Sequence, residues 1–168
     1  MHSRLLILEK RRDPYMLRVL YVDDEPAMLR LISILFETDD EIKIIGTSSA
    51  SKALELLKKN AFDLLISDYQ MPAMDGITLL KELRAEGNEI PFILLTGQGR
   101  QEIFMEALDK GADICLQKKA EPDAQFIELK KAIIKISKKE SIGECVCPVR
   151  KDYRGINDTA SAAAVVRE

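Results

Sequence analysis

Acidic residues, a threonine and a lysine stand where four short apolar runs of the sequence end. Asp23 and Asp24 follow the first run, Asp68 ends the second, and Thr96 and Lys118 follow two later ones. Clustered carboxylates raise one another's pKa unless a cation offsets their charge, and a hard divalent ion such as Mg²⁺ does this well. A carboxylate nucleophile beside a metal, a hydroxyl and an ammonium indicates phosphoryl transfer.

These five residues can act together only if the runs form neighbouring parallel strands. Continuous apolar runs of this length are typical of strands buried on both faces of a parallel sheet. The expected strands are Arg18–Val22, Ile42–Gly46, Leu64–Asp68, Pro91–Leu95 and Ile114–Gln117. The carboxyl ends of such strands form the edge of the sheet where ligands bind.

A helical pattern follows each expected strand. The first helix begins at Pro26, Ser49 caps the second, and the others cover Ile77–Glu86, Gln101–Lys110 and Asp123–Ser137. Five strands alternating with five helices predict an α/β fold, a doubly wound five-stranded parallel sheet with helices on both faces.

The last expected helix carries two sets of apolar residues. The spacing of three and four predicts a core face made of Phe126, Leu129, Ile133 and Ile136. Ile127 and Ile134 lie to one side of that face, and we interpret them as additional core. A homodimer through the last helices is the alternative use of this surface.

Composition excludes several classes of protein. Of the 168 residues, 46% are apolar, which supports one packed domain, and the net charge of -3 offers no general basic field, so we expect no direct nucleic-acid binding. No apolar run is long enough to cross a membrane or to form the core of a signal peptide. Three cysteines are too few for a disulfide framework. We therefore expect a cytoplasmic protein without membrane contact.

The strand and helix pattern sets the expected domain boundaries. It covers residues 16–139, whereas residues 1–15 fit an N-terminal extension and residues 140–168 fit a C-terminal tail or linker. Cys145 and Cys147 are a weak metal motif, because no further ligand lies near them in the sequence. Two free thiols in the tail are the favoured interpretation.

Four stretches of the sequence resemble the receiver domains of two-component response regulators. They are VLYVDDEP (19–26), LLISDYQMPAMDG (64–76), LLTG (94–97) and GADICLQK (111–118). The resemblance covers roughly residues 17–138, and all four motifs in this order and spacing are highly specific. It implies the flavodoxin-like strand order 2-1-3-4-5 and a signalling domain rather than an enzyme.

The resemblance also implies roles for the residues at the strand ends. Asp68 would accept a phosphoryl group from a sensor histidine kinase, a phosphotransfer protein or a small phosphodonor. Thr96 and Lys118 would contact the phosphoryl oxygens. The implied ligands of Mg²⁺ are Asp23, Asp24, Asp68 and the backbone carbonyl of Gln70. Phosphorylation would switch a protein-interaction surface for a downstream partner or output domain, and the domain would catalyse only its own phosphorylation and dephosphorylation.

Two positions depart from the family's pattern. Cys115 stands where the family usually has an aromatic ring that rotates inward on phosphorylation. A cysteine cannot reproduce this rotation. Thr96 and Cys115 are the expected switch positions. Lys119 replaces the usual proline after the lysine. We assign the site lysine to Lys118, because it aligns with the end of the strand.

Two other functions fit part of the pattern. A haloacid-dehalogenase-like phosphatase also uses aspartate, threonine, lysine and acidic metal ligands, but it needs an acid/base aspartate where this chain has Gln70. A degenerate receiver that serves as a static docking module would keep the fold without the phosphorylation.

Overall fold

The computed structural model describes residues 16–97 and 99–138 of the chain. The expected N-terminal extension, the C-terminal tail and the two cysteines of that tail lie outside the described residues. No helix in the described part is both long and apolar enough to span a membrane.

Five parallel strands form a single sheet, in the order β2-β1-β3-β4-β5. The strands are β1 (Leu17–Val22), β2 (Ile42–Thr47), β3 (Leu64–Asp68), β4 (Phe92–Thr96) and β5 (Ile114–Gln117). Both the predicted α/β class and the predicted order 2-1-3-4-5 are confirmed. The sheet thus places β1 and β3, the strands that lead into the acidic residues, directly beside each other.

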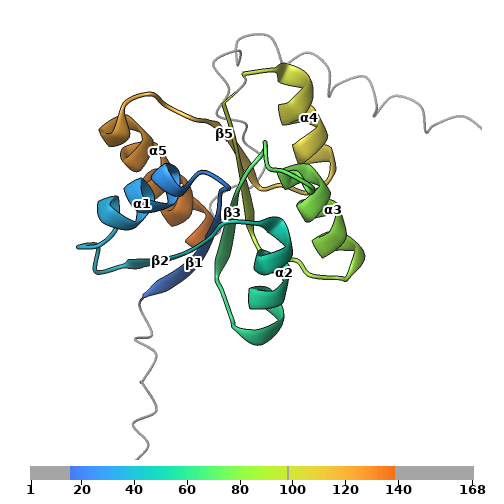
Figure 1. Cartoon of the computed structure of the whole chain (residues 1–168), viewed down its shortest axis with the longest axis horizontal. Helices are drawn as coiled ribbons and strands as arrows, with labels where there is room; N and C mark the ends of the chain where they lie inside the picture. The colour runs from blue at the N-terminus through green and yellow to red at the C-terminus, as the bar shows by residue number, and fades with distance from the viewer. Residues whose placement is uncertain (1–15, 98, 139–168) are drawn as a thin grey trace, which may run out of the picture.

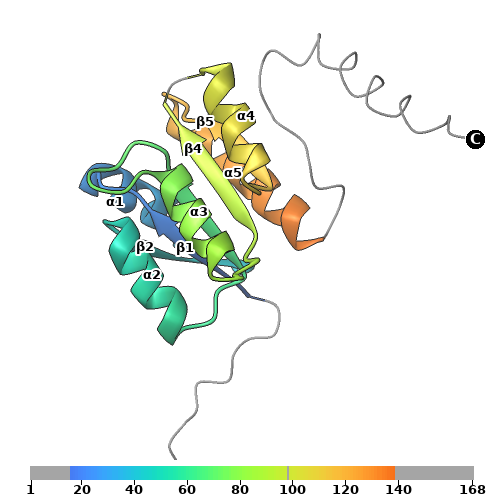
Figure 2. The same cartoon turned by 90° about the vertical axis from the view of Figure 1, so that its right-hand side faces the viewer.

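Two layers of helices cover the sheet. They are α1 (Pro26–Leu35), α2 (Ala50–Lys59), α3 (Gly76–Ala85), α4 (Gln101–Asp109) and α5 (Pro122–Ser137). Figure 1 shows α1 and α5 on one side of the sheet and α2, α3 and α4 on the other, and Figure 2 shows the second layer from a perpendicular direction.

Alternate side chains of the central strands supply two separate cores. In β4, Phe92 and Leu94 pack in the cluster beneath α2, α3 and α4, whereas Ile93 and Leu95 pack in the cluster beneath α1 and α5. All five residues of β3 and of β4 are buried. Because neighbouring side chains of a strand point to opposite faces, an uninterrupted apolar run is what a strand covered on both sides requires.

Side-chain caps begin two of the helices as the local chemistry favours. Ser49 Oγ accepts a hydrogen bond from the backbone N–H of Lys52 at 3.3 Å, which confirms the predicted cap of α2. Asp75 Oδ1 accepts from the backbone N–H of Thr78 at 2.7 Å and caps α3. The second cap holds the start of α3 close to the loop that follows β3.

The side face of α5 is more exposed than the sequence analysis expected. Ile127 is 51% exposed, so its interpretation as additional core is wrong, and Ile134 is only half-buried. The helix buries the stripe formed by Gln125, Leu129, Ala132, Ile133 and Ile136, and Ile127 lies outside it. Helical periodicity gives the direction of the apolar face but does not show how far the neighbouring layer extends.

An ion pair ties the loop between α1 and β2 to α5. The Nζ of Lys130 donates to Asp39 Oδ2, while the backbone N–H groups of Glu41 and Ile42 donate to Asp39 Oδ1 at 3.0 and 3.1 Å. Burial acts to raise the pKa of Asp39, but the hydrogen bonds from Lys130 and the backbone outweigh it, so this pKa lies below its ordinary value. Ionised Asp39 therefore stabilises the fold.

The substitution Asp39→Asn should lower the free energy of unfolding by about 1 kcal/mol at neutral pH, since it removes one charged hydrogen bond. Because the folded-state pKa is lowered, this stabilisation is present above the ordinary pKa of Asp39 and is lost as pH falls through the folded-state value. Chemical denaturation should therefore show a smaller difference between the variant and the wild type at about pH 3 than at about pH 6. A difference independent of pH, or an equal loss in the exposed Asp40→Asn, would contradict this account.

Candidate functional site

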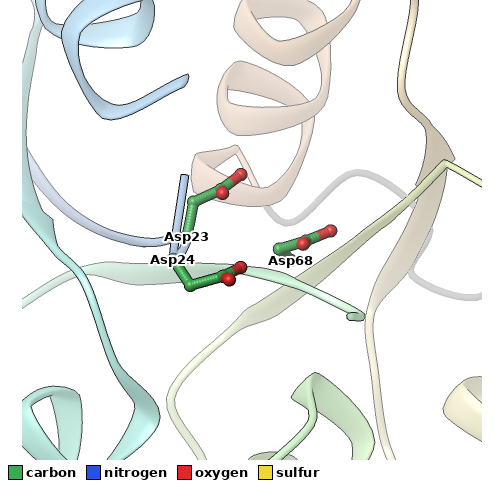
Figure 3. A group of neighbouring side chains, drawn as sticks. All are labelled: Asp23, Asp24 and Asp68. Carbon is green, nitrogen blue, oxygen red and sulfur yellow. The ribbon is translucent and has the colours of Figure 1, made fainter. Parts of the chain in front are cut away.

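Three aspartates meet at the carboxyl ends of β1 and β3. Asp23 and Asp24 follow β1 directly, Asp68 is the last residue of β3, and the two strands pair with Val22 beside Ser67. One carboxylate oxygen from each of the three lies within 4.8 Å of the others. Figure 3 shows the three side chains together, with their carboxylate groups turned to the same side. Asp23 is fully buried and Asp68 is 3% exposed.

One lysine joins two of these carboxylates. Lys118 directly follows β5, and its Nζ lies 2.9 Å from Asp23 Oδ2 and 3.1 Å from Asp68 Oδ1. The ammonium of the next residue is directed elsewhere, because Lys119 Nζ lies 3.5 Å from Glu128 Oε2 on α5. The geometry therefore brings Lys118 into the acidic cluster and pairs Lys119 with α5.

The electrostatics of the cluster oppose the ionisation of Asp68. Burial raises the pKa of Asp68, and the charge of Asp23 adds to the rise, which Lys118 offsets only in part. Burial acts to lower the pKa of Lys118, but its hydrogen bonds and charge interactions with Asp23 and Asp68 outweigh this, so the pKa is raised and the ammonium stays charged. Three carboxylates around one ammonium leave an excess of negative charge for a further cation to balance.

Tyr21 is a member of the site that the sequence analysis missed. It is fully buried in β1, and its hydroxyl donates to Asp23 Oδ2 at 3.1 Å, while the backbone N–H of Glu25 donates to Asp23 Oδ1 at 2.9 Å. Burial, and next the charge of Asp23, raise the pKa of Tyr21, so the hydroxyl remains a neutral donor. The signal was present in the spacing, because residues two apart on a strand point to the same face.

The two expected switch positions lie on adjacent strands. Thr96 is fully buried at the end of β4, and its carbonyl accepts the backbone N–H of Lys118 at 2.8 Å. Cys115 is fully buried in β5, in the core beneath α4, with its Sγ 3.9 Å from the carbonyl oxygen of Phe104. The roles of Thr96 and Cys115 in switching stay predictions.

The loop after Asp68 is packed against the strand that carries it. The backbone N–H of Gly76 donates to the carbonyl of Tyr69 at 3.0 Å. A Cβ at Gly76 would lie 2.4 Å from the carbonyl oxygen of Asp68 and 2.7 Å from Leu94 Cδ1, so a larger residue cannot be accommodated without displacing the backbone. Gln70 is exposed on this loop, and the role of its carbonyl as a metal ligand stays a prediction.

The donor set fits a hard divalent cation. Mg²⁺ takes oxygen ligands and is commonly held by one or two carboxylates together with water and phosphate oxygens. The three aspartates supply such oxygens in one place, and their charge exceeds that of Lys118. Asp24 is only half-buried, which leaves the cluster open to solvent on one side.

Comparisons with known proteins agree with this geometry. A family model for the response regulator receiver domain matches residues 19–133. A nitrate/nitrite response regulator protein homolog of Haemophilus influenzae is 34% identical over 116 residues, 68% of this chain and 56% of that protein. The two-component response regulator ORR22 of Oryza sativa subsp. indica is 36% identical over 116 residues, 67% of this chain and 16% of that protein.

A solved structure of similar fold is the receiver domain of the Francisella response regulator 1452. It has a TM-score of 0.62 and 30% sequence identity, and the match covers 71% of this chain and 98% of that one. The chain belongs to the response regulator receiver family of two-component signalling systems. It spans 56% and 16% of the length of the two curated relatives described here.

The glycine of the loop provides a test of how tightly the acceptor strand is held. The substitution Gly76→Ala should lower the free energy of unfolding by about 2 kcal/mol, because the new methyl group overpacks the Asp68 carbonyl and Leu94. Gly97→Ala is the matched control, since a Cβ at Gly97 meets nothing within 4 Å and should change stability little. Equal stability of the two variants in chemical denaturation would show that the loop yields easily.

Proposed function

We propose that Asp68 is the phosphoacceptor of this receiver domain. The observation that carries the proposal is the position of its carboxylate, which lies buried at the end of β3, within 3.1 Å of the Lys118 ammonium and inside the acidic cluster. An oxygen of Asp68 would form a bond to phosphorus as the bond from phosphorus to the donor's nitrogen or oxygen breaks. The electron pair of that bond leaves with the donor.

The surrounding residues would prepare this step by position and charge. Lys118 would exchange part of its contact with the carboxylates for the oxygens of the incoming phosphoryl group, and the Thr96 hydroxyl would donate to the same group. Asp23 and Asp24, with Asp68 and the Gln70 carbonyl, would hold Mg²⁺, which receiver domains bind in general. When bound, Mg²⁺ offsets charge on the phosphoryl oxygens.

Phosphorylation would then change a surface at the same end of the molecule. The added charge and oxygens favour the conformation in which Thr96 and Lys118 contact them, and a partner that binds this conformation better shifts the population further. Receiver domains interact with histidine kinases or phosphotransfer proteins, and we propose such a donor here. We further propose that residues 16–139 form the receiver domain, acting on a protein partner or output domain. The absence of direct nucleic-acid binding and the cytoplasmic location stay predictions. A homodimer through the last helices stays a prediction as well.

Intact-mass spectrometry tests the acceptor directly. After incubation with Mg²⁺ and acetyl phosphate or phosphoramidate, the wild type should gain one base-labile phosphoryl group, and Asp68→Asn should gain none. Since burial raises the pKa of Asp68, ionisation of this carboxyl group lowers the stability of the folded state above its ordinary pKa, so the asparagine variant is expected to be at least as stable. The lack of an adduct in that variant therefore reports the lost carboxylate rather than unfolding.

Two other outcomes would overturn the proposal in different ways. A wild type that binds Mg²⁺ but gains no phosphoryl group would be a docking module. Steady hydrolysis of phosphate esters by the purified protein, beyond a single modification of Asp68, would indicate a phosphatase.

The metal assignment makes a separate prediction. Asp24→Asn should weaken Mg²⁺ binding by at least about tenfold, because it removes one charged oxygen ligand while the buried pair of Asp23 and Lys118 is left in place. Isothermal titration calorimetry measures the effect, and Asp40→Asn, an exposed acid remote from the cluster, is the control. An unchanged affinity in Asp24→Asn would remove that residue from the ligand set.

A further inference from the structure

The loop that carries Lys118 is held by a buried side chain of α5. Gln125 lies in the first part of α5 and is 1% exposed, and its Oε1 accepts a hydrogen bond from the backbone N–H of Lys119 at 2.7 Å. The N–H of Lys118 itself donates to the carbonyl of Thr96 at 2.8 Å. The peptide groups before and after the Cα of Lys118 are therefore both fixed, one by β4 and the other by α5.

The position of Gln125 within α5 is unusual for an amide. Its neighbours along the same face of the helix are Leu129, Ile133 and Ile136, all of them buried. Among the described residues, the buried Nε2 of Gln125 has no hydrogen-bond partner. A buried amide whose donor is unpaired disfavours folding, and an apolar side chain of equal size would avoid this loss. An apolar residue would lack the oxygen, Gln125 Oε1, that accepts the hydrogen bond from the backbone N–H of Lys119.

The residue on the other side of this hydrogen bond is also held by α5. Lys119 contributes its backbone N–H to Gln125, and its ammonium lies 3.5 Å from Glu128, one turn further along the helix. The two contacts fix the main chain and the side chain of Lys119 to the same helix. A residue without an N–H at this position, such as proline, would leave Gln125 Oε1 without its donor.

We propose that Gln125 is a positioning residue for Lys118. Its hydrogen bond to Lys119 fixes the backbone from which the Lys118 side chain reaches across to Asp23 and Asp68. Gln125 touches neither the carboxylates nor the reacting atoms and acts only through the loop. The inference deepens the proposed function, on which its phosphorylation readout rests, whereas its metal readout is independent of phosphoryl transfer.

Two variants of Gln125 distinguish the effect of its hydrogen-bond acceptor from the effect of its side-chain volume. Gln125→Met keeps the size and removes the acceptor, whereas Gln125→Glu keeps an acceptor oxygen. With a less ordered Lys118, phosphorylation of Asp68 by acetyl phosphate, followed by intact mass, should be about tenfold slower in Gln125→Met and largely restored in Gln125→Glu. Ile136→Val, which trims the core face of the same helix far from the loop, should phosphorylate at the wild-type rate.

Mg²⁺ affinity gives the second readout, which requires no phosphoryl transfer. The Lys118 ammonium competes with a cation for Asp23 and Asp68, so loosening it in Gln125→Met should tighten Mg²⁺ binding by about threefold in calorimetry. Lys118→Ala should tighten it further, and adding Gln125→Met to Lys118→Ala should change nothing more, because the residue acts through that lysine.

The outcomes distinguish this inference from the proposed function. If the wild type gains no phosphoryl group but Gln125→Met still tightens Mg²⁺ binding only when Lys118 is present, the phosphoacceptor proposal fails and the positioning role stands. A folded Gln125→Met with wild-type Mg²⁺ affinity, or one whose effect persists in Lys118→Ala, would overturn the positioning role.

Discussion

The carboxyl end of the sheet depends on one ammonium between two carboxylates that are withdrawn from water. Asp23 and Asp68 are buried and close together, and the charge of Asp23 adds to the rise in the pKa of Asp68 that burial causes. Lys118 supplies the ammonium from β5, two strands away from β3 in the sheet order. Within the described chain, no residue of β1 or β3 brings a cation to Asp23 and Asp68. The cation comes instead from the β5 side, and the long side chain of lysine spans the distance that the strand order creates.

The rest of the fold serves to keep these groups at fixed positions. β3 and β4 are buried on both faces, so the acceptor strand and its neighbour have little freedom to shift. Tyr21 and the N–H of Glu25 hold the two oxygens of Asp23, and Gly76 lets the first turn of α3 lie against the Asp68 carbonyl. Each of these contacts restricts which residue can occupy its position, and together they give the cluster a defined geometry.

The apolar runs that alternate with helical patterns predicted the α/β class and the groups at the strand ends, whereas the strand order was implied by the resemblance to receiver domains. Sequence reasoning missed the parts of the site that depend on tertiary distance. Tyr21 reads as an ordinary core aromatic until the position of the Asp23 carboxylate is known. Gln125 interrupts the apolar face of α5, but only the path of the β5–α5 loop shows which N–H it meets. The exposure of Ile127 depends on where the neighbouring layer ends.

The place of β5 in the sheet has a mechanical consequence. β3, which carries Asp68, is hydrogen-bonded to a strand on each side, whereas β5 pairs with β4 alone among the described strands. Shifting β3 would break two ladders, but shifting β5 would break one. Asp68 thus ends a strand that is held by two ladders, whereas Lys118 follows an edge strand that is held by one. A change of charge at Asp68 therefore reaches, through Lys118, an edge strand whose displacement breaks a single ladder.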